Sequence, residues 1–373
     1  MARQKVLVVF GTRPEAIKLA PVVRALRSRP ESFEVVVAVT AQHREMLDQV
    51  LRTFEIRADH DLDIMRANQS LFDVTRMALA GLEPVYRAEH PDVVIVQGDT
   101  TTAFIGALAA YYLKIRVGHV EAGLRTWDKF RPFPEEMNRR LVSVVADYNF
   151  APTRHARANL LREGVEDSTI FVTGNTVIDA LLEVTSRPYR FRNAELAGLG
   201  AKSRIILVTV HRRESFGAAM EGMCRAVADI VRTAEDLEVV LPVHPNPTVG
   251  ATVRGILSRE RRVHLIEPVE YEEFAHLMKR SHIVLTDSGG IQEEAPSLGK
   301  PVLVLREKTE RPEAIEAGTA RLVGVERERI VAEARRLLED GVAYAAMSNA
   351  ANPYGDGHAA ERIADIMAGL GGG

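Results

Sequence analysis

Cysteine is almost absent from this chain of 373 residues, because Cys224 is the only one. A single thiol excludes a disulfide within the chain, and the helical apolar pattern around Cys224 indicates that it fills a core. Long apolar runs are absent too, and the first run, Lys5–Phe10, has the length of a strand. A secretory signal and a membrane-spanning segment are therefore not expected, and we predict a cytoplasmic protein without membrane association.

An excess of charge of one sign is also missing. The chain has 48 Lys and Arg residues against 51 Asp and Glu residues, a net charge of −3, and its basic residues are scattered. This argues against a nucleic-acid-binding surface. A Gly-x-Gly-x-x-Gly fingerprint, a Walker lysine motif and the usual metal-ligand spacings are all absent, so neither a dinucleotide cofactor nor a metal is expected.

Two series of alternating strands and helices are present, in a chain longer than one core usually supports. The first series begins at Lys5–Phe10, the second begins at Ile205–Val210, and the linking region lies between Gly174 and Ser203. This pattern predicts the α/β class, with two doubly wound Rossmann-like domains. Ligands bind such domains at the carboxyl ends of their strands, so we expect the two domains to face a cleft.

The most informative stretch begins with the apolar strand Ile283–Thr286 and continues through Ser288, Gly289 and Gly290 into a helical segment. At the end of such a strand, the free N–H groups of the helix start can bind an anion, and two glycines allow close approach. Ser288 can cap the helix or bond a phosphate oxygen. The alternative is an ordinary capped turn without a ligand.

Basic residues occupy the equivalent place in the first half. Arg13 follows the strand Lys5–Phe10 directly, and Lys18 lies about one turn into the next helix. An arginine where a strand ends and a helix begins can bind a phosphate through two hydrogen bonds. We interpret the pair as ligand-binding residues, although Lys18 alone is equally well explained as a solvated side chain.

Three acidic residues accompany these cations. Asp99 follows a buried strand, where it can cap the next helix or face a ligand. Glu121 ends the next strand and is expected to contact Arg125 or a ligand. Glu135 begins a helix after a proline-rich loop, where the helix dipole favours acids. Because like charges raise one another's pKa, three acids at one rim favour a role in proton transfer.

Further strand ends in the second half carry histidines. His211 follows the strand Ile205–Val210 beside two arginines and is interpreted as a phosphate or sugar contact, although a lone histidine is often structural. His244 follows another strand. Phe274, near the start of a helix, fills a core or walls in a base. The residues alone predict an enzyme that acts on a phosphorylated or nucleotide-bearing substrate by acid–base chemistry.

Six longer motifs extend this prediction. They are Gly11–Pro21, Gln97–Thr101, His119–Arg125, Pro132–Arg139, Val210–Gly217 and Thr286–Pro296. In order and spacing they resemble the non-hydrolysing UDP-N-acetylglucosamine 2-epimerases, and the match runs from Lys5 to about Gly357.

The resemblance implies a GT-B glycosyltransferase fold in a homodimer, with the last helix crossing back to the first domain. The domains are then residues 1–174 with 358–373, and residues 175–357, the second of which binds UDP. It also implies reversible conversion of UDP-N-acetylglucosamine to UDP-N-acetylmannosamine, which supplies surface polysaccharide synthesis. Elimination of UDP to a 2-acetamidoglucal and re-addition is the feasible route, because the hydrogen at C2 is not adjacent to a carbonyl.

The resemblance assigns roles to individual residues. The catalytic group contains four residues. Three of them carry protons or orient the groups that do, namely Asp99, Glu121 and Glu135, and the fourth, His211, contacts the diphosphate. The substrate-binding residues are Arg13, Lys18, Phe274, Ser288, Gly289, Gly290, Glu294 and Arg311. Regulated members of the family bind a second substrate molecule through residues that match Gln42, His43 and His244. Glu45 and Asn68 depart from the regulated pattern, which leaves allosteric control open.

Other reactions fit parts of the pattern. A hydrolysing 2-epimerase releases UDP, an epimerase for a UDP-diacetamido sugar accepts a different substituent, and a retaining GT-B glycosyltransferase shares the fold and the diphosphate site. The glycosyltransferase has no need of three acids near C2. A nucleotide-sugar-binding module without catalysis is disfavoured because each acidic position is filled.

Overall fold

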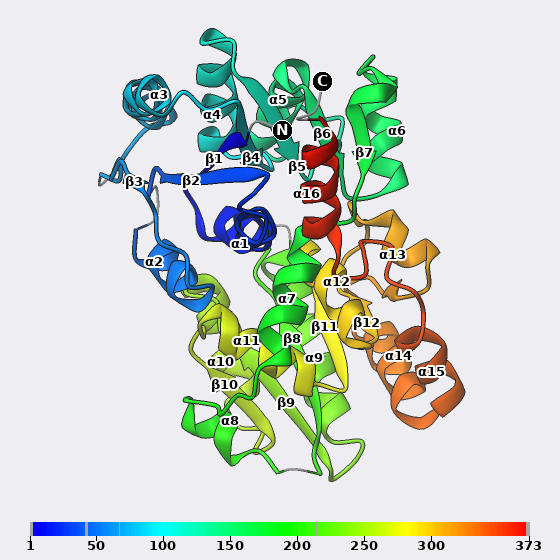
Figure 1. Ribbon diagram of the computed structural model, residues 1–373. Helices are drawn as coiled ribbons and strands as arrows, with labels where there is room; N and C mark the ends of the chain where they lie inside the picture. Colours follow the sequence, from blue (N-terminus) through cyan, green and yellow to red (C-terminus); the bar gives the residue numbers. More distant parts are fainter. Residues whose placement is uncertain (1–2, 42–43, 67, 201, 213–214, 371–373) are drawn as a thin grey trace. The chain divides into compact units, whose positions relative to one another are not determined.

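The computed structural model describes residues 3–41, 44–66, 68–200, 202–212 and 215–370. The chain forms two compact units, and Figure 1 shows its elements. Unit 1 contains Met1–Ala180 and Tyr354–Gly373, and unit 2 contains Leu181–Pro353. The first crossing falls within helix α7 (Thr176–Ser186). The domain boundaries at 174/175 and 357/358 stay a prediction.

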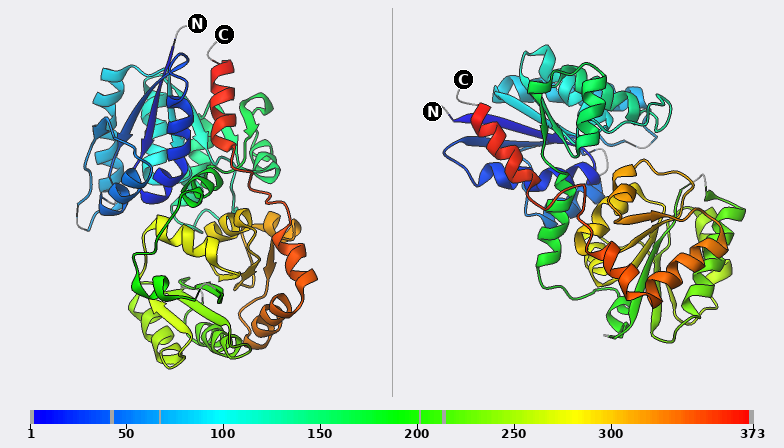
Figure 2. Two further views of the ribbon diagram at one scale, coloured as in Figure 1. Left: turned by 60° about the horizontal axis from the view of Figure 1, so that its bottom comes forward. Right: turned by 90° about the vertical axis from the view of Figure 1, so that its right-hand side faces the viewer.

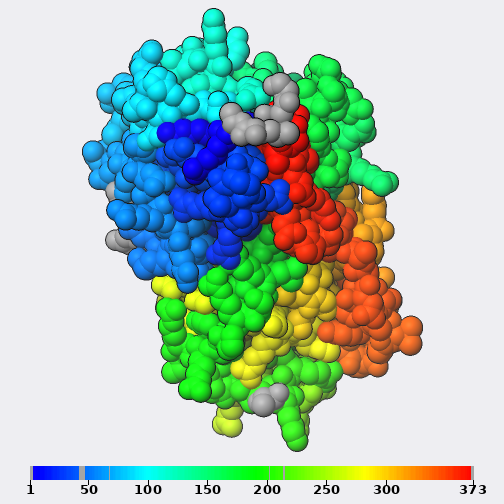
Figure 3. Space-filling view, viewed as in Figure 1, coloured from blue at the N-terminus to red at the C-terminus, as the bar shows by residue number. Residues whose placement is uncertain are grey.

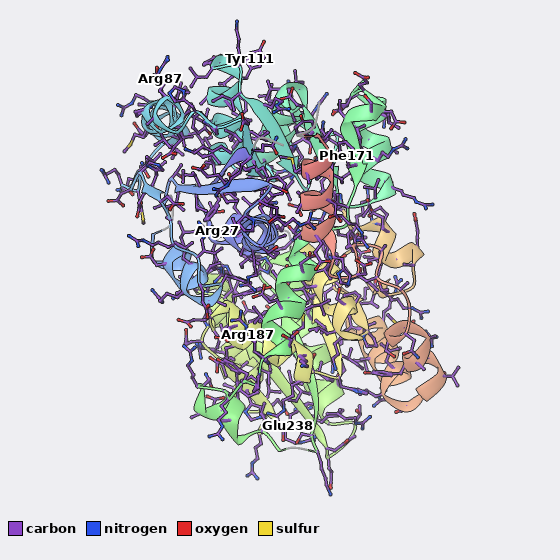
Figure 4. All side chains as sticks on the ribbon, in the orientation of Figure 1. Arg27, Arg87, Tyr111, Phe171, Arg187 and Glu238 are labelled. Carbon is purple, nitrogen blue, oxygen red and sulfur yellow. The ribbon has the colours of Figure 1, made fainter. Side chains whose placement is uncertain are left out.

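Unit 1 is built on a parallel sheet with the order β3-β2-β1-β4-β5-β6-β7. Its strands are β1 (Gln4–Phe10), β2 (Phe33–Val39), β3 (His60–Asp61), β4 (Val93–Gln97), β5 (Arg116–Val120), β6 (Tyr148–Ala151) and β7 (Ile170–Val172). Every residue of β1 except Lys5 is buried, because helices cover both faces of the sheet. At the far strands, the ring centroids of Phe150 on β6 and Phe171 on β7 lie 6.0 Å apart, and Phe171 is labelled in Figure 4.

Within the described residues, seven helices belong wholly to unit 1, and α7 begins in it. The seven are α1 (Arg13–Arg27), α2 (Arg44–Thr53), α3 (Leu71–Glu89), α4 (Thr101–Tyr112), α5 (Glu135–Val145), α6 (Arg154–Arg162) and α16 (Ala359–Leu370). In Figures 1 and 2, α1 and α16 lie on one face of the sheet, and α3, α4 and α5 lie on the other.

The last helix belongs to unit 1 although it follows unit 2 in the chain. Helix α16 packs against α1, and the two helices form adjacent surfaces in the space-filling view of Figure 3. Arg29, just beyond α1, pairs with Asp365 of α16 at 2.7 Å. The predicted return of the last helix to the first domain is thus confirmed.

Unit 2 has a second parallel sheet, with the order β10-β9-β8-β11-β12-β13. Its strands are β8 (Arg204–Thr209), β9 (Leu237–Pro242), β10 (Val263–Ile266), β11 (Ile283–Thr286), β12 (Val302–Val304) and β13 (Ala320–Leu322). Its helices are α8 (Ala194–Gly198), α9 (Ala218–Val231), α10 (Pro247–Leu257), α11 (Tyr271–Arg280), α12 (Gly289–Glu294), α13 (Pro312–Glu316), α14 (Arg327–Glu339) and α15 (Gly341–Ser348). Cys224 is buried in the core of this unit, as predicted.

The predicted α/β class with two doubly wound, Rossmann-like domains is confirmed, because both sheets are parallel and reverse their strand order once. The reversal falls between β1 and β4 in unit 1 and between β8 and β11 in unit 2. In the described part of the chain, no helix is both long enough and apolar enough to span a bilayer.

Candidate active site

The predicted site residues follow the strands on either side of these reversals, where an open α/β sheet forms its ligand-binding crevice. In unit 1, Arg13 begins α1 directly after the turn that follows β1, and the loop after β4 carries Asp99. In unit 2, the loop after β8 carries His211 and the loop after β11 carries Ser288.

The turn between β1 and α1 is held by a buried carboxylate that the sequence analysis missed. Glu15 accepts hydrogen bonds from the amides of Gly11 (3.1 Å) and Thr12 (2.8 Å) and from the hydroxyls of Thr12 (2.7 Å) and Thr100 (2.7 Å). Burial raises the pKa of Glu15, and these hydrogen bonds partly oppose the rise. Glu15 thereby connects two segments, the turn that precedes Arg13 and the loop after β4.

Glycine is required at the start of this turn. A β-carbon on Gly11 would lie 2.1 Å from the hydroxyl oxygen of Thr40 and 2.6 Å from that of Thr102. Arg13, two residues further, is half-buried and has no hydrogen bond or ion pair with the described residues. Its guanidinium therefore keeps its hydrogen-bonding capacity for a ligand.

Glu121 accepts hydrogen bonds from three different side chains of unit 1. It follows β5 with a left-handed φ of 65°. The ammonium group of Lys18 donates to both of its carboxylate oxygens, at 2.6 and 2.7 Å. The amide nitrogens of Gln97 and of Asn175, at 3.0 Å, also donate to it. The structure brings Lys18 and Glu121 together, and three donors favour the ionised carboxylate.

The expected contact between Glu121 and Arg125 is wrong. Arg125 instead donates to the carboxylate of Glu163 at 2.7 Å and to the hydroxyl of Ser143 at 3.0 Å. The positive φ of Glu121 turns the chain away from the strand direction, so spacing along the sequence did not give the partner. Lys18, which comes from the first helix, takes that place.

Asp99 is bound by an arginine and does not cap the next helix. The guanidinium of Arg139 donates to its carboxylate, and the side-chain amide of Asn138 donates to its backbone carbonyl at 2.9 Å. The cap of α4 is Thr100, whose hydroxyl accepts from the amide of Ala103 at 3.0 Å. The capping interpretation of Asp99 is therefore wrong, and its carboxylate is held at the loop by α5.

Glu135 begins α5, as predicted, and its side chain makes no hydrogen bond or ion pair with the described residues. Its neighbour Glu136 is fully buried and accepts from the amide of Thr126 at 3.0 Å. Glu136 also lies 3.6 Å from Arg139, the residue that binds Asp99. The two neighbouring acids thus differ, since Glu136 anchors the loop and Glu135 stays available to a ligand.

A neutral histidine lies beneath these acids. His119 is fully buried, and its Nε2 lies 2.8 Å from the carbonyl of Gly98. Burial lowers the pKa of His119 to about 4. At neutral pH it therefore adds no charge next to Glu121.

In unit 2, the loops after β8 and β11 are joined by Asp287. Its carboxylate accepts from the amides of His211 (2.8 Å) and Arg212 (2.9 Å), and it lies 2.9 Å from Nδ1 of His211. Burial raises the pKa of Asp287, but the hydrogen bonds from His211 and Arg212 outweigh it, so the pKa lies below its ordinary value. An ionised, fully buried carboxylate thus orients His211.

The ring of His211 also stacks on that of His244, with centroids 5.6 Å apart. Burial and the nearby charge of His211 lower the pKa of His244. The other two residues that the resemblance relates to regulation, Gln42 and His43, lie outside the described residues. Allosteric control stays an open prediction.

Ser288 is the N-cap residue of α12, as predicted, but its hydroxyl makes no capping hydrogen bond. Two guanidinium groups lie beside the glycines that follow. A β-carbon on Gly289 would lie 3.7 Å from the guanidinium of Arg311 and 3.9 Å from that of Arg212. Arg212 was not among the predicted site residues, although it follows His211 directly. Backbone N–H groups beside two cations provide the chemistry that a diphosphate requires.

Arg311 is fixed by its neighbours in the loop before α13. Its Nε donates to the buried Glu293, and its amide donates to the hydroxyl of Thr309 at 3.0 Å. That hydroxyl donates to Gln292 of α12 at 2.6 Å. The guanidinium is thus preorganised beside the start of α12.

The remaining predicted residues differ in their placement. The carboxylate of Glu294 would lie 3.7 Å from a β-carbon on Gly290, which puts it beside the glycines. Phe274 lies half-buried on α11, and no described contact joins it to the glycines. Among the described residues, no group of three histidine, cysteine or acidic side chains is arranged to hold a metal ion.

Two parallel sheets of Rossmann order, with acids at the strand ends of one and cations beside a glycine turn of the other, are typical of enzymes for nucleotide-linked substrates. The family model for UDP-N-acetylglucosamine 2-epimerase matches residues 24–368 of this chain. The chain therefore belongs to the UDP-N-acetylglucosamine 2-epimerase family.

Individual relatives agree. The UDP-N-acetylglucosamine 2-epimerase of Escherichia coli K12 is 56% identical over 369 residues, which cover 97% of this chain and 98% of the relative. The Neisseria meningitidis UDP-GlcNAc 2-epimerase, solved bound to UDP-GlcNAc, is 48% identical with a TM-score of 0.87 and coverage of 98% and 99%. S. aureus MnaA, solved with UDP, is 46% identical with a TM-score of 0.88 and coverage of 99% and 97%.

Proposed function

We propose that this protein interconverts UDP-N-acetylglucosamine and UDP-N-acetylmannosamine by inverting C2 of the sugar. The observation that carries the proposal is the Lys18–Glu121 pair at the strand ends of unit 1, in a chain of the 2-epimerase family. Solved relatives are bound to UDP-GlcNAc and to UDP. The carboxylate of Glu121 can take a proton, and the glycine turn of unit 2 can bind a diphosphate. These two functions match the chemistry that these ligands require.

The reaction that we propose is an elimination followed by an addition. The C1–O bond breaks and its electron pair leaves with UDP, while an enzyme carboxylate removes the C2 proton and a C1–C2 double bond forms. The products are UDP and 2-acetamidoglucal. UDP then adds back to C1, while C2 receives a proton on the other face. The route is feasible because leaving-group departure makes C1 cationic and C2–H acidic.

The residues divide by chemistry. Asp99, Glu121 and Glu135 carry protons or orient the groups that do. The diphosphate is bound by Arg13, His211, Ser288 and the amides of Gly289 and Gly290. We add Arg212 to this group because its guanidinium lies beside Gly289. Arg311 contacts the sugar and phosphate region, and Phe274 and Glu294 contact the uridine. Each charged hydrogen bond to the diphosphate contributes roughly 1.5–3 kcal/mol.

Incubation with UDP-N-acetylglucosamine alone separates this function from its alternatives. We expect UDP-N-acetylmannosamine to appear with no more than a trace of free UDP, and without added metal or nicotinamide cofactor. A hydrolysing 2-epimerase would release UDP in step with free N-acetylmannosamine. A glycosyltransferase would leave the sugar unchanged without an acceptor, and a diacetamido-sugar epimerase would require another substrate. Chromatography of the nucleotides distinguishes these outcomes.

We also propose that the protein forms a homodimer, that it is located in the cytoplasm, and that its product supplies surface polysaccharide synthesis. Large exposed apolar side chains support the homodimer. They are Phe72 on α3, Tyr111 and Tyr112 on α4, and Leu141 and Val144 on α5. Helix α4 packs against both α3 and α5, and Tyr111 lies at the edge of unit 1 in Figure 4. Three adjacent helices thus offer apolar groups to a partner.

A further inference from the structure

Asn175 is a buried residue in the segment between β7 and α7, far in sequence from the acids of unit 1. Its side-chain nitrogen donates to Oε1 of Glu121 at 3.0 Å. Lys18 of α1 and Gln97 of β4 also donate to that carboxylate. Glu121 is therefore held from three directions. Lys18 supplies a positive charge, and the two amides supply neutral hydrogen bonds.

The orientation of the Asn175 amide is fixed by a second hydrogen bond. Its side-chain oxygen accepts from the backbone amide of Val177 at 3.2 Å, which forms a turn at the start of α7. Because the oxygen is used in this turn, the nitrogen is the atom directed at Glu121. Asn175 is only 1% exposed, so water does not replace this donor.

The backbone of Asn175 is in turn held by the segment that returns to unit 1. The amide of Asn175 donates to the carbonyl of Tyr354 at 2.7 Å, and Tyr354 is fully buried. Beside this hydrogen bond two glycines meet. A β-carbon on Gly174 would lie 3.4 Å from the α-carbon of Gly355. Both glycines have positive φ values, 93° and 134°, a backbone conformation that favours glycine in both segments.

The returning segment is itself tied to unit 1. Arg362 of α16 donates to the carbonyl of Thr173 at 3.0 Å and pairs with Asp356 at 2.6 Å. Asp179 of α7 accepts from the amide of Ala360 at 2.7 Å. The chain leaves unit 1 shortly after Asn175 and re-enters it at Tyr354. The hydrogen bond from Asn175 to Glu121 thus lies close to the two segments through which the chain leaves unit 1 and returns to it.

We propose that Asn175 is a positioning residue for Glu121, and that the segment returning at Tyr354 fixes Asn175 in this role. The inference rests on the proposed function, in which Glu121 takes part in proton transfer. Three donors stabilise the ionised carboxylate and set its orientation at the end of β5. Among the described residues, Lys18 donates to it and His119 is neutral at the pH of the reaction. The guanidinium groups of Arg125 and Arg139, which together with Glu121 influence the pKa of His119, add fixed positive charges.

Two substitutions of Asn175 test the proposal through the pH dependence of turnover. Asn175→Ser keeps an oxygen for the turn with Val177 but has no donor that reaches Glu121. Asn175→Asp keeps the shape and places a second carboxylate oxygen against Glu121. We expect the acidic limb of the kcat profile to move to higher pH by about one unit in the serine variant and further in the aspartate variant. KM should stay within about twofold.

Asp179→Ala is the matched control, because it removes another buried hydrogen bond to the returning segment without contact to Glu121. It should lower the melting temperature and leave the acidic limb in place. If the aspartate variant does not fold, the serine variant still decides the question. An acidic limb unchanged in the folded Asn175 variants would overturn the inference, even if kcat falls.

Glu121→Gln, measured in the same series, separates this inference from the proposed function. If Glu121→Gln retains the turnover of the parent, Glu121 carries no proton and both proposals for this residue fail. If Glu121→Gln is inactive while the Asn175 variants keep the parent's acidic limb, only the positioning role fails. A shifted limb together with an inactive Glu121→Gln variant supports both.

Discussion

Glu121→Gln is expected to lower turnover by about a thousandfold, within the range that positioned proton transfer contributes. An amide is similar in shape to the carboxylate but cannot take a proton. It also offers only one acceptor oxygen to the donors Lys18, Gln97 and Asn175, so we expect a modest loss of stability as well. Affinity for UDP should stay near that of the parent, because the proposed diphosphate contacts do not include Glu121. Steady-state kinetics and calorimetric titration with UDP measure the two effects.

Glu89→Gln is the matched control for this substitution. Glu89 forms the same type of ion pair, with Lys5 at 2.6 Å, but at the opposite end of the same sheet. The hydrogen bond from Lys5 holds the pKa of Glu89 below its ordinary value. This variant should keep turnover within about twofold of the parent, because the pair lies away from the proposed site and surface ion pairs contribute little to stability. If Glu121→Gln kept its turnover as well, the carboxylate of Glu121 would be a structural partner of Lys18.

Asp287→Ala is expected to weaken both the fold of unit 2 and the binding of UDP. The substitution leaves the buried amides of His211 and Arg212 without their acceptor and removes the partner of the His211 ring. We expect the free energy of unfolding to fall by about 2–4 kcal/mol. UDP affinity should fall at least tenfold, because His211 loses its orientation. Urea denaturation and UDP titration at a temperature where the variant is folded measure these changes.

Asp236→Ala provides the comparison within the same unit. Asp236 binds the guanidinium of Arg204 through two hydrogen bonds of 2.7 and 2.9 Å, at the opposite end of the sheet and exposed to solvent. Its loss should change neither stability nor UDP affinity appreciably. If Asp287→Ala kept the UDP affinity of the parent, the loop that carries His211 would not be part of the diphosphate site.

The sequence predicted the frame of the fold well, because strand-length apolar runs and glycine turns are local signals. The strand Ile283–Thr286 was placed at its observed bounds, and the predicted strand Lys5–Phe10 differs from β1 by one residue. Short elements with few apolar residues were missed, such as α8 and β13. Three or five residues carry too little periodicity to be recognised, and tertiary packing decides their conformation.

The sequence predicted where the site residues lie along the chain but not which side chains bind them. Parallel strands end at one edge of a sheet, so Asp99, Glu121 and His211 could be placed at strand ends from sequence alone. Their partners come from distant segments, as Asn175 does for Glu121, and no spacing rule connects them. Asp287 is different, because it directly precedes Ser288 at a strand end. An acid directly after a buried strand is a signal that the sequence offers, and it predicts a carboxylate at the same edge of the sheet as His211.

Proton exchange at C2 tests the central claim most directly. With UDP-N-acetylglucosamine in D2O, the proposed cycle removes the C2 proton and returns one from solvent, so UDP-N-acetylmannosamine must carry deuterium at C2. Deuterium should also accumulate in the recovered substrate as the reversible reaction continues, and mass spectrometry with proton NMR detects both. Product that carries only protium at C2 would contradict the elimination mechanism and the roles of Asp99, Glu121 and Glu135.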